Sequence, residues 1–419
     1  QEKLKNIYSW KALEFAFPNE YAKLAAIKSG SYIPGASLPI DVDVYNTEQQ
    51  STVFVAIPRI QDGVPLTLGY VTREVSVDGN PLIAPYPSWN YNDVKYCDGL
   101  TSVYRMQVDK CERLWVLDTG ILGEKQICRP KIHVFSLHDN KLITMYRFPQ
   151  NQFKESSLFV TIAVDVRDTE DKCKDTFAYI ADVTGFALLV YDFRNSRSWR
   201  ITNNNSEAAA RSFVPFSINS NETNFRIQAG LVDELVRGTK CDVSLLACQD
   251  VTSAAVNHQR NPVTNNLYYS PLSSHGLYYV DTEQFRNPQY EANTTTRIII
   301  HPTLTNGMKN TQSSAKVVSK SGVLFFGLVG DSALGCWNEH RTLERHNIRT
   351  VAQSDETLQM IASMKIKYIN REYILVLSNK MQKMVNNDFN FDDVNFRIMN
   401  ANVNELILNT RCENPDNDR

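Results

Sequence analysis

The sequence lacks several features that would assign it to a broad class at once. It has no run of 18 apolar residues in its 419 positions, so no membrane-spanning helix is expected. It also lacks a charge excess, because 44 Lys and Arg stand against 46 Asp and Glu for a formal net charge of -2. A nucleic-acid-binding protein is usually clearly basic and a disordered tail protein strongly charged, so neither class fits. The 42% of hydrophobic residues is enough for a sizeable core.

Sequence patterns for catalysis and metal binding are also missing. The chain has no Gly-x-Ser-x-Gly turn and no Cys-x-x-Cys pair, and none of its seven histidines has a partner at the spacing of a helical metal site. Acidic or amide side chains near strand ends are the remaining candidate metal ligands, but such residues more often form turns. These candidates are Asp98, Asp165, Asp182 and Asn265. We therefore expect no catalytic residue, no metal and no cofactor.

Cysteines and sequons favour a secreted, extracellular glycoprotein with disulfide bonds. The eight cysteines are Cys97, Cys111, Cys128, Cys173, Cys241, Cys248, Cys336 and Cys412. The first four allow three pairings, between which the sequence does not decide, and the state of Cys241 and Cys248 stays open. The Asn-x-Ser/Thr sequons begin at Asn204, Asn221 and Asn293. The chain starts at Gln1 rather than Met, which fits a processed N-terminus, with an expression boundary as the alternative.

Short strands dominate the rest of the sequence. The pattern indicates a short helix near Tyr21–Ile27 and few other helices. Six apolar segments, rich in β-branched and aromatic residues, recur at intervals of about 50 to 90 residues, which suits four-stranded blades with long loops. These segments are 53–57, 113–118, 177–182, 266–270, 323–327 and 373–377.

Neighbouring strands turn the recurring segments into meanders. An apolar strand that ends in a turn precedes several of them, as at Met106–Asp109, and a strand that ends in Asp follows, as at Ala187–Asp192. A single meander cannot bury both of its faces, so six of them must stack. We predict an all-β fold, a six-bladed β-propeller of four-stranded blades, in one domain over residues 1–419, with an N-terminal arm at 1–30 and a closure tail at 395–419. A pair of irregular β-sandwiches is the alternative.

Closing such a ring requires strands from both ends of the chain. The N-terminal candidate lies near Ile7–Phe15, and the C-terminal candidate is the apolar segment Ile398–Leu408. In this arrangement Cys336 and Cys412 are placed to pin the tail to the fifth or sixth blade.

Three segments carry a family resemblance. They are 109–118 (DKCERLWVLD), 179–182 (YIAD) and 264–271 (TNNLYYSP). With them the chain resembles the yellow and major royal jelly protein family over nearly its whole length. Residues 311–419 are most similar to an abundant royal jelly member, through segments 320–328 (KSGVLFFGL) and 333–338 (ALGCWN). The resemblance implies a six-bladed propeller, secretion by an insect, and glycosylation.

The resemblance implies several functions rather than one. Royal jelly members are nutrient proteins that associate with sterols and a small helical peptide. Our first hypothesis is therefore a storage and carrier protein that binds an apolar ligand, a small partner peptide and other copies of itself. Salivary members bind biogenic amines of the serotonin and dopamine type, which gives the alternative hypothesis. Cuticle members are linked to dopachrome conversion, which gives an enzymatic alternative. The tail after Ile398 has two possible roles. It closes the propeller, or, by the same resemblance, it offers an amphipathic strand to a partner chain.

Five residues are candidates for a ligand pocket. By resemblance, Phe325, Phe326 and Asn338 lie on the motif that contributes to the amine pocket of salivary members. An aromatic ring offers its face to a cation, and an amide both donates and accepts hydrogen bonds. Thr161 and Tyr179 are expected as further walls. Because Phe325 and Phe326 are consecutive in a strand, only one of them is expected to face the channel, and the alternative is that both pack in the core.

Two segments depart from the family pattern. Between Gln228 and Asn261 the family usually has a short strand that leads to Ala-Leu-Ser-Pro, whereas this chain has an unfamiliar stretch with two cysteines. At Lys367–Tyr368, royal jelly members have about a dozen more residues, the size of a loop. The sequence leaves open whether the protein itself lacks that loop or whether the loop is only missing from the printed sequence.

Overall fold

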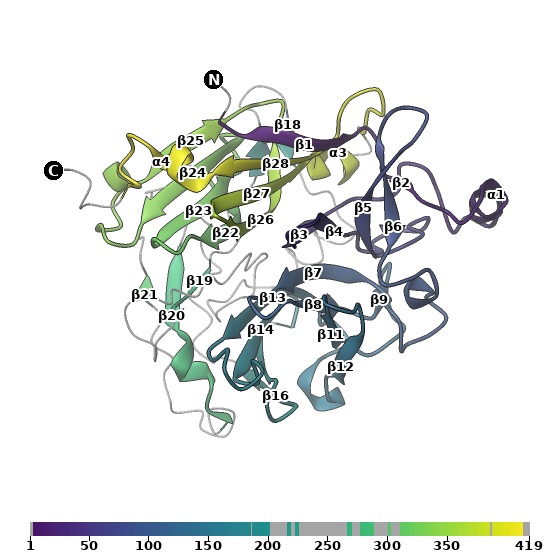
Figure 1. The fold of residues 1–419 in the computed structure, drawn as a ribbon, viewed down its shortest axis with the longest axis horizontal. Helices are drawn as coiled ribbons and strands as arrows, with labels where there is room; N and C mark the ends of the chain where they lie inside the picture. The colour runs from purple at the N-terminus through teal and green to yellow at the C-terminus, as the bar shows by residue number, and fades with distance from the viewer. Residues whose placement is uncertain are drawn as a thin grey trace.

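The computed structural model describes nine stretches of the chain: 3–185, 187–201, 216–218, 223–225, 266–269, 277–288, 301–302, 311–385 and 388–413. Their strands form mainly antiparallel sheets that stand around a common centre, which is the arrangement of an all-β propeller (Figure 1). Several features that the sequence singled out lie outside these stretches: segment 228–261 with Cys241 and Cys248, and the sequons at Asn204, Asn221 and Asn293.

The first sheet along the chain has five strands in the spatial order β2–β6–β5–β4–β3. They are β2 (Glu14–Phe15), β3 (Asp41–Asn46), β4 (Ser51–Ala56), β5 (Leu68–Val75) and β6 (Pro81–Pro85). The helix α1 (Glu20–Ser29) projects beside this sheet (Figure 1). The Asn19 side chain caps its start by accepting a hydrogen bond from Ala22 N at 2.8 Å, and Gly30, with a left-handed φ of 75°, ends it. The helix predicted near Tyr21–Ile27 is confirmed.

The second and third sheets are four-stranded meanders, in the orders β12–β11–β8–β7 and β13–β14–β15–β16. Their strands are β7 (Val103–Val108), β8 (Arg113–Asp118), β11 (Lys131–Ser136), β12 (Leu142–Arg147), β13 (Phe159–Val166), β14 (Thr176–Asp182), β15 (Ala187–Asp192) and β16 (Arg197–Ile201). The loops of these first three sheets contain a small hairpin and two 3₁₀ turns: β9 (Ile121–Leu122), β10 (Lys125–Gln126), η1 (Asn90–Asn92) and η2 (Gln150–Gln152).

Smaller pieces are described in the next part of the chain, before a further complete sheet. A strand pair and a three-stranded sheet come first: β17 (Phe216–Ile218), β18 (Thr223–Phe225), β19 (Asn266–Tyr269), β20 (Tyr278–Asp281) and β21 (His301–Pro302), with the turn η4 (Thr282–Phe285). The complete sheet then runs β22 (Ser313–Val318), β23 (Val323–Leu328), β24 (Ala333–Asn338) and β25 (Arg349–Gln353), with the turn η6 (Arg345–Asn347).

The last sheet joins the two ends of the chain. Its spatial order is β1–β28–β27–β26. The elements are β1 (Lys5–Trp10), β26 (Met360–Ile369), β27 (Arg371–Asn379) and β28 (Phe396–Asn402), with the helix α3 (Met381–Val385) before β28. Lys5 lies opposite Asn400 and Trp10 opposite Phe396, so the N-terminal strand closes the ring against the C-terminal one. At the junction noted in the sequence, β26 and β27 form a tight hairpin around Asn370, whose φ is 61°.

Both predicted closure segments need correction at one end. Ile398–Leu408 is not one strand, because β28 ends at Asn402 and the helix α4 (Val403–Ile407) follows. The Asn402 side chain caps this helix by accepting a hydrogen bond from Glu405 N at 3.2 Å. The apolar side chains of α4 then reach the core at helical spacing: Val403, Leu406 and Ile407. The N-terminal segment Ile7–Phe15 divides between two sheets, since β1 ends at Trp10 and β2 belongs to the first sheet.

Apolar cores lie between neighbouring sheets, as stacked blades require. In β13, Ile162 and Val164 pack with Trp115 of the second sheet, whereas Ala163 packs with Leu267 of the three-stranded sheet. Because side chains alternate between the two faces of a strand, a strand covered on both sides is apolar throughout. Within the described stretches, no helix is long and apolar enough to cross a membrane.

Three disulfides tie the described parts together. Cys97 pairs with Cys128, and Cys111 pairs with Cys173, which links the second sheet to the third. The sequence had left these pairings open. Cys336 of β24 pairs with Cys412 of the tail, with their Cα atoms 6.1 Å apart, as the closure argument predicted.

Replacing both Cys336 and Cys412 by Ala should lower the free energy of unfolding by about 4–5 kcal/mol, because the bond closes a loop with a sequence separation of 76 residues. Urea unfolding followed by intrinsic fluorescence measures this change. The matched control is the double Ala variant of Cys97 and Cys128, whose separation of 31 residues gives a smaller loss in the same model. A Cys336/Cys412 variant as stable as the parent would contradict the expectation.

Candidate functional site

The centre of the propeller is bordered by the edge strands of its sheets. Five strands stand at the inner edges (Figure 1): β3, β7, β13, β22 and β26. Of these, β3 lies beside both β7 and β26. Ligand sites favour the mouths of closed β architectures, so the polar side chains that these strands carry form the candidate site.

Asp41, at the start of β3, is fully buried and receives contacts from two other sheets. Met106 N donates a hydrogen bond to its Oδ2 at 2.7 Å, and the Ser363 hydroxyl donates to its Oδ1. Lys365 Nζ lies 3.3 Å from Oδ1, and Arg105 Nη1 lies 3.7 Å from the same atom. One carboxylate therefore connects the first, second and last sheets.

Asp43, two positions further along β3, repeats the arrangement. Lys367 Nζ lies 2.7 Å from its Oδ1, and Val108 N donates to its Oδ2 at 2.6 Å. Lys365 and Lys367 also donate to backbone carbonyls of β7, at 2.9 Å and 3.1 Å. Because a strand repeats every two residues, Asp41 and Asp43 each have a lysine and a β7 backbone amide as partners, and Arg105 and Ser363 contact Asp41 in addition. We name these residues together the axial charge cluster: Asp41, Asp43, Arg105, Lys365 and Lys367.

Every carboxylate of the axial charge cluster has a cation beside it. Both carboxylates are fully buried, and the three cationic side chains are only 7% to 16% exposed. A general acid or base must be able to exchange a proton with a substrate, but each of these carboxylates already accepts backbone hydrogen bonds and lies beside a cation. In the part of the chain that the structure describes, no group of three or more His, Cys, Asp or Glu could hold a metal ion. The arrangement therefore joins three sheets.

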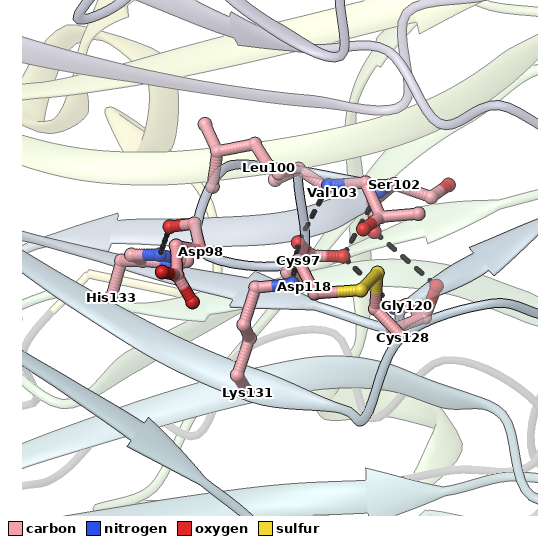
Figure 2. A network of polar contacts seen from close by, with 12 residues as sticks. Cys97, Asp98, Leu100, Ser102, Val103, Asp118, Gly120, Cys128, Lys131 and His133 are labelled. Atoms are coloured by element: carbon pink, nitrogen blue, oxygen red, sulfur yellow. Dashed lines mark hydrogen bonds and ion pairs between the residues drawn. A yellow bond between two sulfur atoms is a disulfide. The ribbon is translucent and has the colours of Figure 1, made fainter. Parts of the chain in front are cut away.

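A second polar network surrounds Asp118, the last residue of β8 (Figure 2). Its Oδ2 accepts a hydrogen bond from Thr101 N at 2.7 Å, and its Oδ1 accepts from Ser102 N and Gly120 N, each at 2.9 Å. Lys131 lies opposite in β11 with Nζ 2.8 Å from Oδ2, and both side chains are fully buried. Burial alone would raise the pKa of Asp118, but Lys131 and the donors Ser102 and Thr101 outweigh it, so the pKa lies below its ordinary value.

Asp182 performs the same task at the end of β14. It accepts hydrogen bonds from Leu158 N at 3.0 Å and Gly185 N at 2.9 Å, and Arg200 Nη1 lies 2.7 Å from its Oδ2. Asp118 and Asp182 thus each hold the loop that enters the first strand of their own sheet. The recurring strand that ends in Asp is a structural anchor, and Asp182, one of the candidate metal ligands, is occupied in this role.

His133 lies buried beside the Asp118 network. Its Nε2–H donates to the Asp98 carbonyl at 3.2 Å, and its ring stacks on Phe135 with centroids 5.8 Å apart. Burial lowers the pKa of His133 to about 4, against the opposing charge of Asp118 and with Lys131 adding to the lowering. The imidazole is therefore neutral at pH 7.

The two consecutive phenylalanines of β23 lie in two different cores. Phe325 packs with Val376 and other residues between its own sheet and the last sheet. Phe326 packs on the opposite face with Tyr268 and Trp337. The exposed fractions of the two rings are 0% and 1%. The prediction that one ring faces the channel is not met in this structure, because both faces of β23 are covered by neighbouring sheets.

The other predicted pocket residues do not join them. Asn338 is fully buried at the end of β24, where its Nδ2 donates to Cys412 O at 3.0 Å and Glu413 O at 3.3 Å, so this amide holds the tail. Thr161 and Tyr179 lie on the third sheet, each 2% exposed, on the face toward the three-stranded sheet. The structure thus separates the five predicted residues into distinct environments.

Sequence reasoning missed the axial charge cluster, although a signal was present. Two innermost strands carry charges at alternate positions in otherwise apolar segments, Asp41-Val42-Asp43 and Lys365-Ile366-Lys367. Two such strands of opposite sign, with charges at the period of a β-strand, indicate ion pairs that repeat along two facing strands.

Replacing Lys367 by Met removes the cation beside Asp43 and leaves a buried carboxylate. The free energy of unfolding should fall by about 3 kcal/mol, because an uncompensated buried charge is costly. Adding Asp43→Asn should recover part of the loss, which urea unfolding of the double-mutant cycle measures. The control is Lys141→Met, whose ion pair with Asp139 is exposed and contributes less than about 1 kcal/mol. Equal losses in the two single variants would refute the role assigned to the cluster.

The lowered pKa of His133 predicts a pH dependence of stability. Between about pH 6.5 and pH 4 the unfolded chain binds a proton at this position and the folded chain does not, so stability falls as the pH falls through this window, by roughly 3 kcal/mol at most. The pKa of Asp118 is lowered in the folded chain, so its contribution to stability is lost only at pH values below this window. His133→Phe should flatten the dependence, and His138→Phe, at an exposed position in the same sheet region, should not. Parallel stability curves for parent and His133→Phe would disprove the assignment.

Comparison with known proteins identifies the family of this chain. The sequence model of the major royal jelly protein family matches residues 101–412. Major royal jelly protein 1 of Apis mellifera is 47% identical over 429 residues, which cover 99% of this chain and 90% of that protein. Major royal jelly protein 3 of Apis mellifera is 41% identical over 425 residues, which cover 98% of this chain and 70% of that protein. A luciferin-regenerating enzyme matches in structure over 96% of this chain and 95% of its own, with 9% identity and a TM-score of 0.47, too low to bear on function. The chain belongs to the major royal jelly protein family.

Proposed function

We propose that this protein is a secreted storage and carrier protein of the royal jelly type, which acts through binding and abundance and performs no catalysis. Membership of the family supports the proposal. The three described disulfides support an extracellular location, because such bonds persist in oxidising surroundings.

One structural observation carries the proposal. The buried carboxylates of the axial charge cluster are bound by cations and backbone donors from neighbouring sheets, so the centre is used for cohesion. A catalytic centre instead keeps a positioned acid or base available to its substrate. Buried ion pairs, disulfides and inter-sheet cores suit a protein that must persist at high concentration outside cells.

The finer architecture belongs to the same proposal. The chain forms one propeller domain over residues 1–419 with six blades, of which the sheet β19–β20–β21 is one. Five other sheets have four or five strands, and this sheet follows the third and precedes β22–β25 along the chain. The sequons at Asn204, Asn221 and Asn293 carry the glycans of the secreted form.

The cargo is a small apolar ligand such as a sterol, and the protein assembles with a small helical peptide and with further copies of itself. This part of the proposal rests on the family. The amine-binding alternative depended on Phe325, Phe326 and Asn338, which are engaged in packing and in holding the tail.

Lipid extraction of the purified protein tests the carrier role. An organic extract examined by mass spectrometry should contain a sterol in roughly stoichiometric amount, because a carrier retains its cargo through mild purification. An unrelated secreted protein, purified from the same medium by the same steps, is the control.

An extract without sterol, or with no more than the control contains, would contradict the carrier role.

Dopachrome absorbance, followed with and without the protein, tests the proposed absence of catalysis. Accelerated loss of absorbance would show catalysis and contradict the proposal that the protein is not an enzyme.

A further inference from the structure

Residues 93–98 form a loop ahead of β7, which we call the covering loop. Both of its ends are fixed, because the buried guanidinium of Arg59 donates to Asn92 O at 2.6 Å and to Leu100 O at 3.2 Å. Between these two points, residues 95–98 are exposed. The middle of the loop can therefore move while its ends stay in place.

The exposed middle of the loop is held to the sheet through Cys97 and Asp98 (Figure 2). Cys97 is bonded to Cys128. The Asp98 carboxylate pairs with Arg147 of β12, but both side chains are exposed, and such pairs contribute little. The Asp98 carbonyl accepts a hydrogen bond from His133 Nε2–H at 3.2 Å. Of these contacts, the hydrogen bond from His133 is the one made by a fully buried side chain.

The ring of His133 is enclosed by aromatic side chains and lacks a second hydrogen bond. It stacks on Phe135 and meets Tyr91 edge-on, with the ring centroids of the latter pair 6.1 Å apart. Burial raises the pKa of Tyr91, so this neighbour is uncharged. Because Nε2 carries the hydrogen, Nδ1 is the unprotonated nitrogen, and it has no hydrogen-bond partner among the described residues. A proton added to Nδ1 therefore finds no acceptor beneath the closed loop.

Groups from every element around the ring influence its protonation. Burial is the largest influence, and it opposes a charge on the ring. Asp118 of β8 and the Asp98 carbonyl favour the charge, whereas Lys131 of β11 and Arg147 of β12 oppose it. The help from Asp118 is limited, since this carboxylate already pairs with Lys131 at 2.8 Å. Together these influences lower the pKa of His133 to about 4, so the ring is neutral at pH 7 beneath the closed loop.

We propose that the covering loop is an acid-operated gate, in which protonation of His133 moves the Asp98–Gly99 peptide away from the ring and admits water to it. This peptide joins the loop to the ring, because its carbonyl accepts from His133 and its N–H, on Gly99, donates to Tyr96 O at 3.0 Å. The fixed ends of the loop and its disulfide remain in place, so the movement is local and reversible. The gate goes beyond the storage and carrier role and does not depend on it.

The direction of the effect follows from the state in which the ring binds a proton more readily. Above about pH 6.5, the ordinary pKa of His, the ring is neutral whether the loop is open or closed, so pH has no effect. Between about pH 6.5 and pH 4 the uncovered ring binds a proton and the covered ring does not, so opening becomes more favourable as the pH falls. Below about pH 4 the ring is protonated in both states, and the effect levels off.

Amide hydrogen exchange at Gly99 tests the gate directly, because this N–H belongs to the peptide that moves. The full-length protein is exchanged at several pH values between 7 and 4.5, and overlapping peptides resolve Gly99 after correction for the intrinsic exchange rate. We expect the protection of Gly99 to fall by about tenfold or more over this range. Constant protection down to pH 4.5 would show that no gate opens.

Urea separates local opening from global unfolding, which also becomes easier in this pH range. Opening a short loop exposes little surface, so exchange at Gly99 should not respond to low urea concentrations, whereas amides of β14 should exchange faster. Gly99 should also exchange faster than the β14 amides at every pH. If Gly99 matched the β14 amides in rate and in urea response, the loop would open only with the whole protein, contrary to the proposal.

Two variants of His133 assign the pH dependence to its ring. His133→Gln keeps an N–H that can donate to Asp98 O but cannot gain a proton, so the pH dependence of exchange at Gly99 should disappear. His133→Phe should give the same flat profile without that hydrogen bond. The control His138→Phe, at an exposed position, should behave as the parent does.

Loss of the ion pair between Asp98 and Arg147 in acid is the competing explanation. Asp98→Asn removes this ion pair and keeps the carbonyl that His133 binds, so this variant should retain the pH dependence of the parent. An Asp98→Asn variant whose exchange no longer depends on pH, or a pH dependence that persists in both His133 variants, would overturn the proposal.

Discussion

Closure of the ring is the constraint on which the rest of this structure depends. Stacked sheets bury their faces only if the first meets the last, and here β1 pairs with β28 so that the two chain ends share one sheet. The contacts that secure closure are long-range: the disulfide Cys336–Cys412, the hydrogen bond from Lys3 Nζ to Leu406 O, and the amide of Asn338 on the tail. Each joins segments that lie far apart in the sequence, so each limits the opening of the ring.

The axial charge cluster stabilises the closed ring through contacts at its centre. Inner edge strands direct one row of backbone groups toward the centre, where no further strand of their own sheet pairs with them. The lysines of β26 and the aspartates of β3 bridge the last sheet to the first, and backbone amides of β7 extend the contact to the second. At the ends of β8 and β14, Asp118 and Asp182 hold the loops from which the second and third sheets start. Buried carboxylates therefore position the blades.

Much of the fold was predictable because its signals are local. Recurring apolar strands indicated the propeller, and the apolar spacing near Tyr21–Ile27 indicated α1. The end of the tail was mistaken for a strand, because a five-residue helix rich in Val, Leu and Ile differs from a strand only through its cap at Asn402. The site was less predictable. Asp41 and Lys365 are 324 residues apart, so their pairing depends on closure. Phe325 and Phe326, assigned to a pocket by resemblance, are both buried in cores, because one strand does not reveal that both of its faces are covered.

Hydrogen exchange of the native protein, followed by mass spectrometry of peptides, tests the central claim most directly. If β1 closes the ring, those amides of residues 5–10 that hydrogen-bond to β28 should exchange as slowly as those of 396–402, because both are released only when the last sheet opens. Rapid exchange in residues 5–10, as in a frayed chain end, while 396–402 stay protected, would contradict closure of the ring by the N-terminal strand.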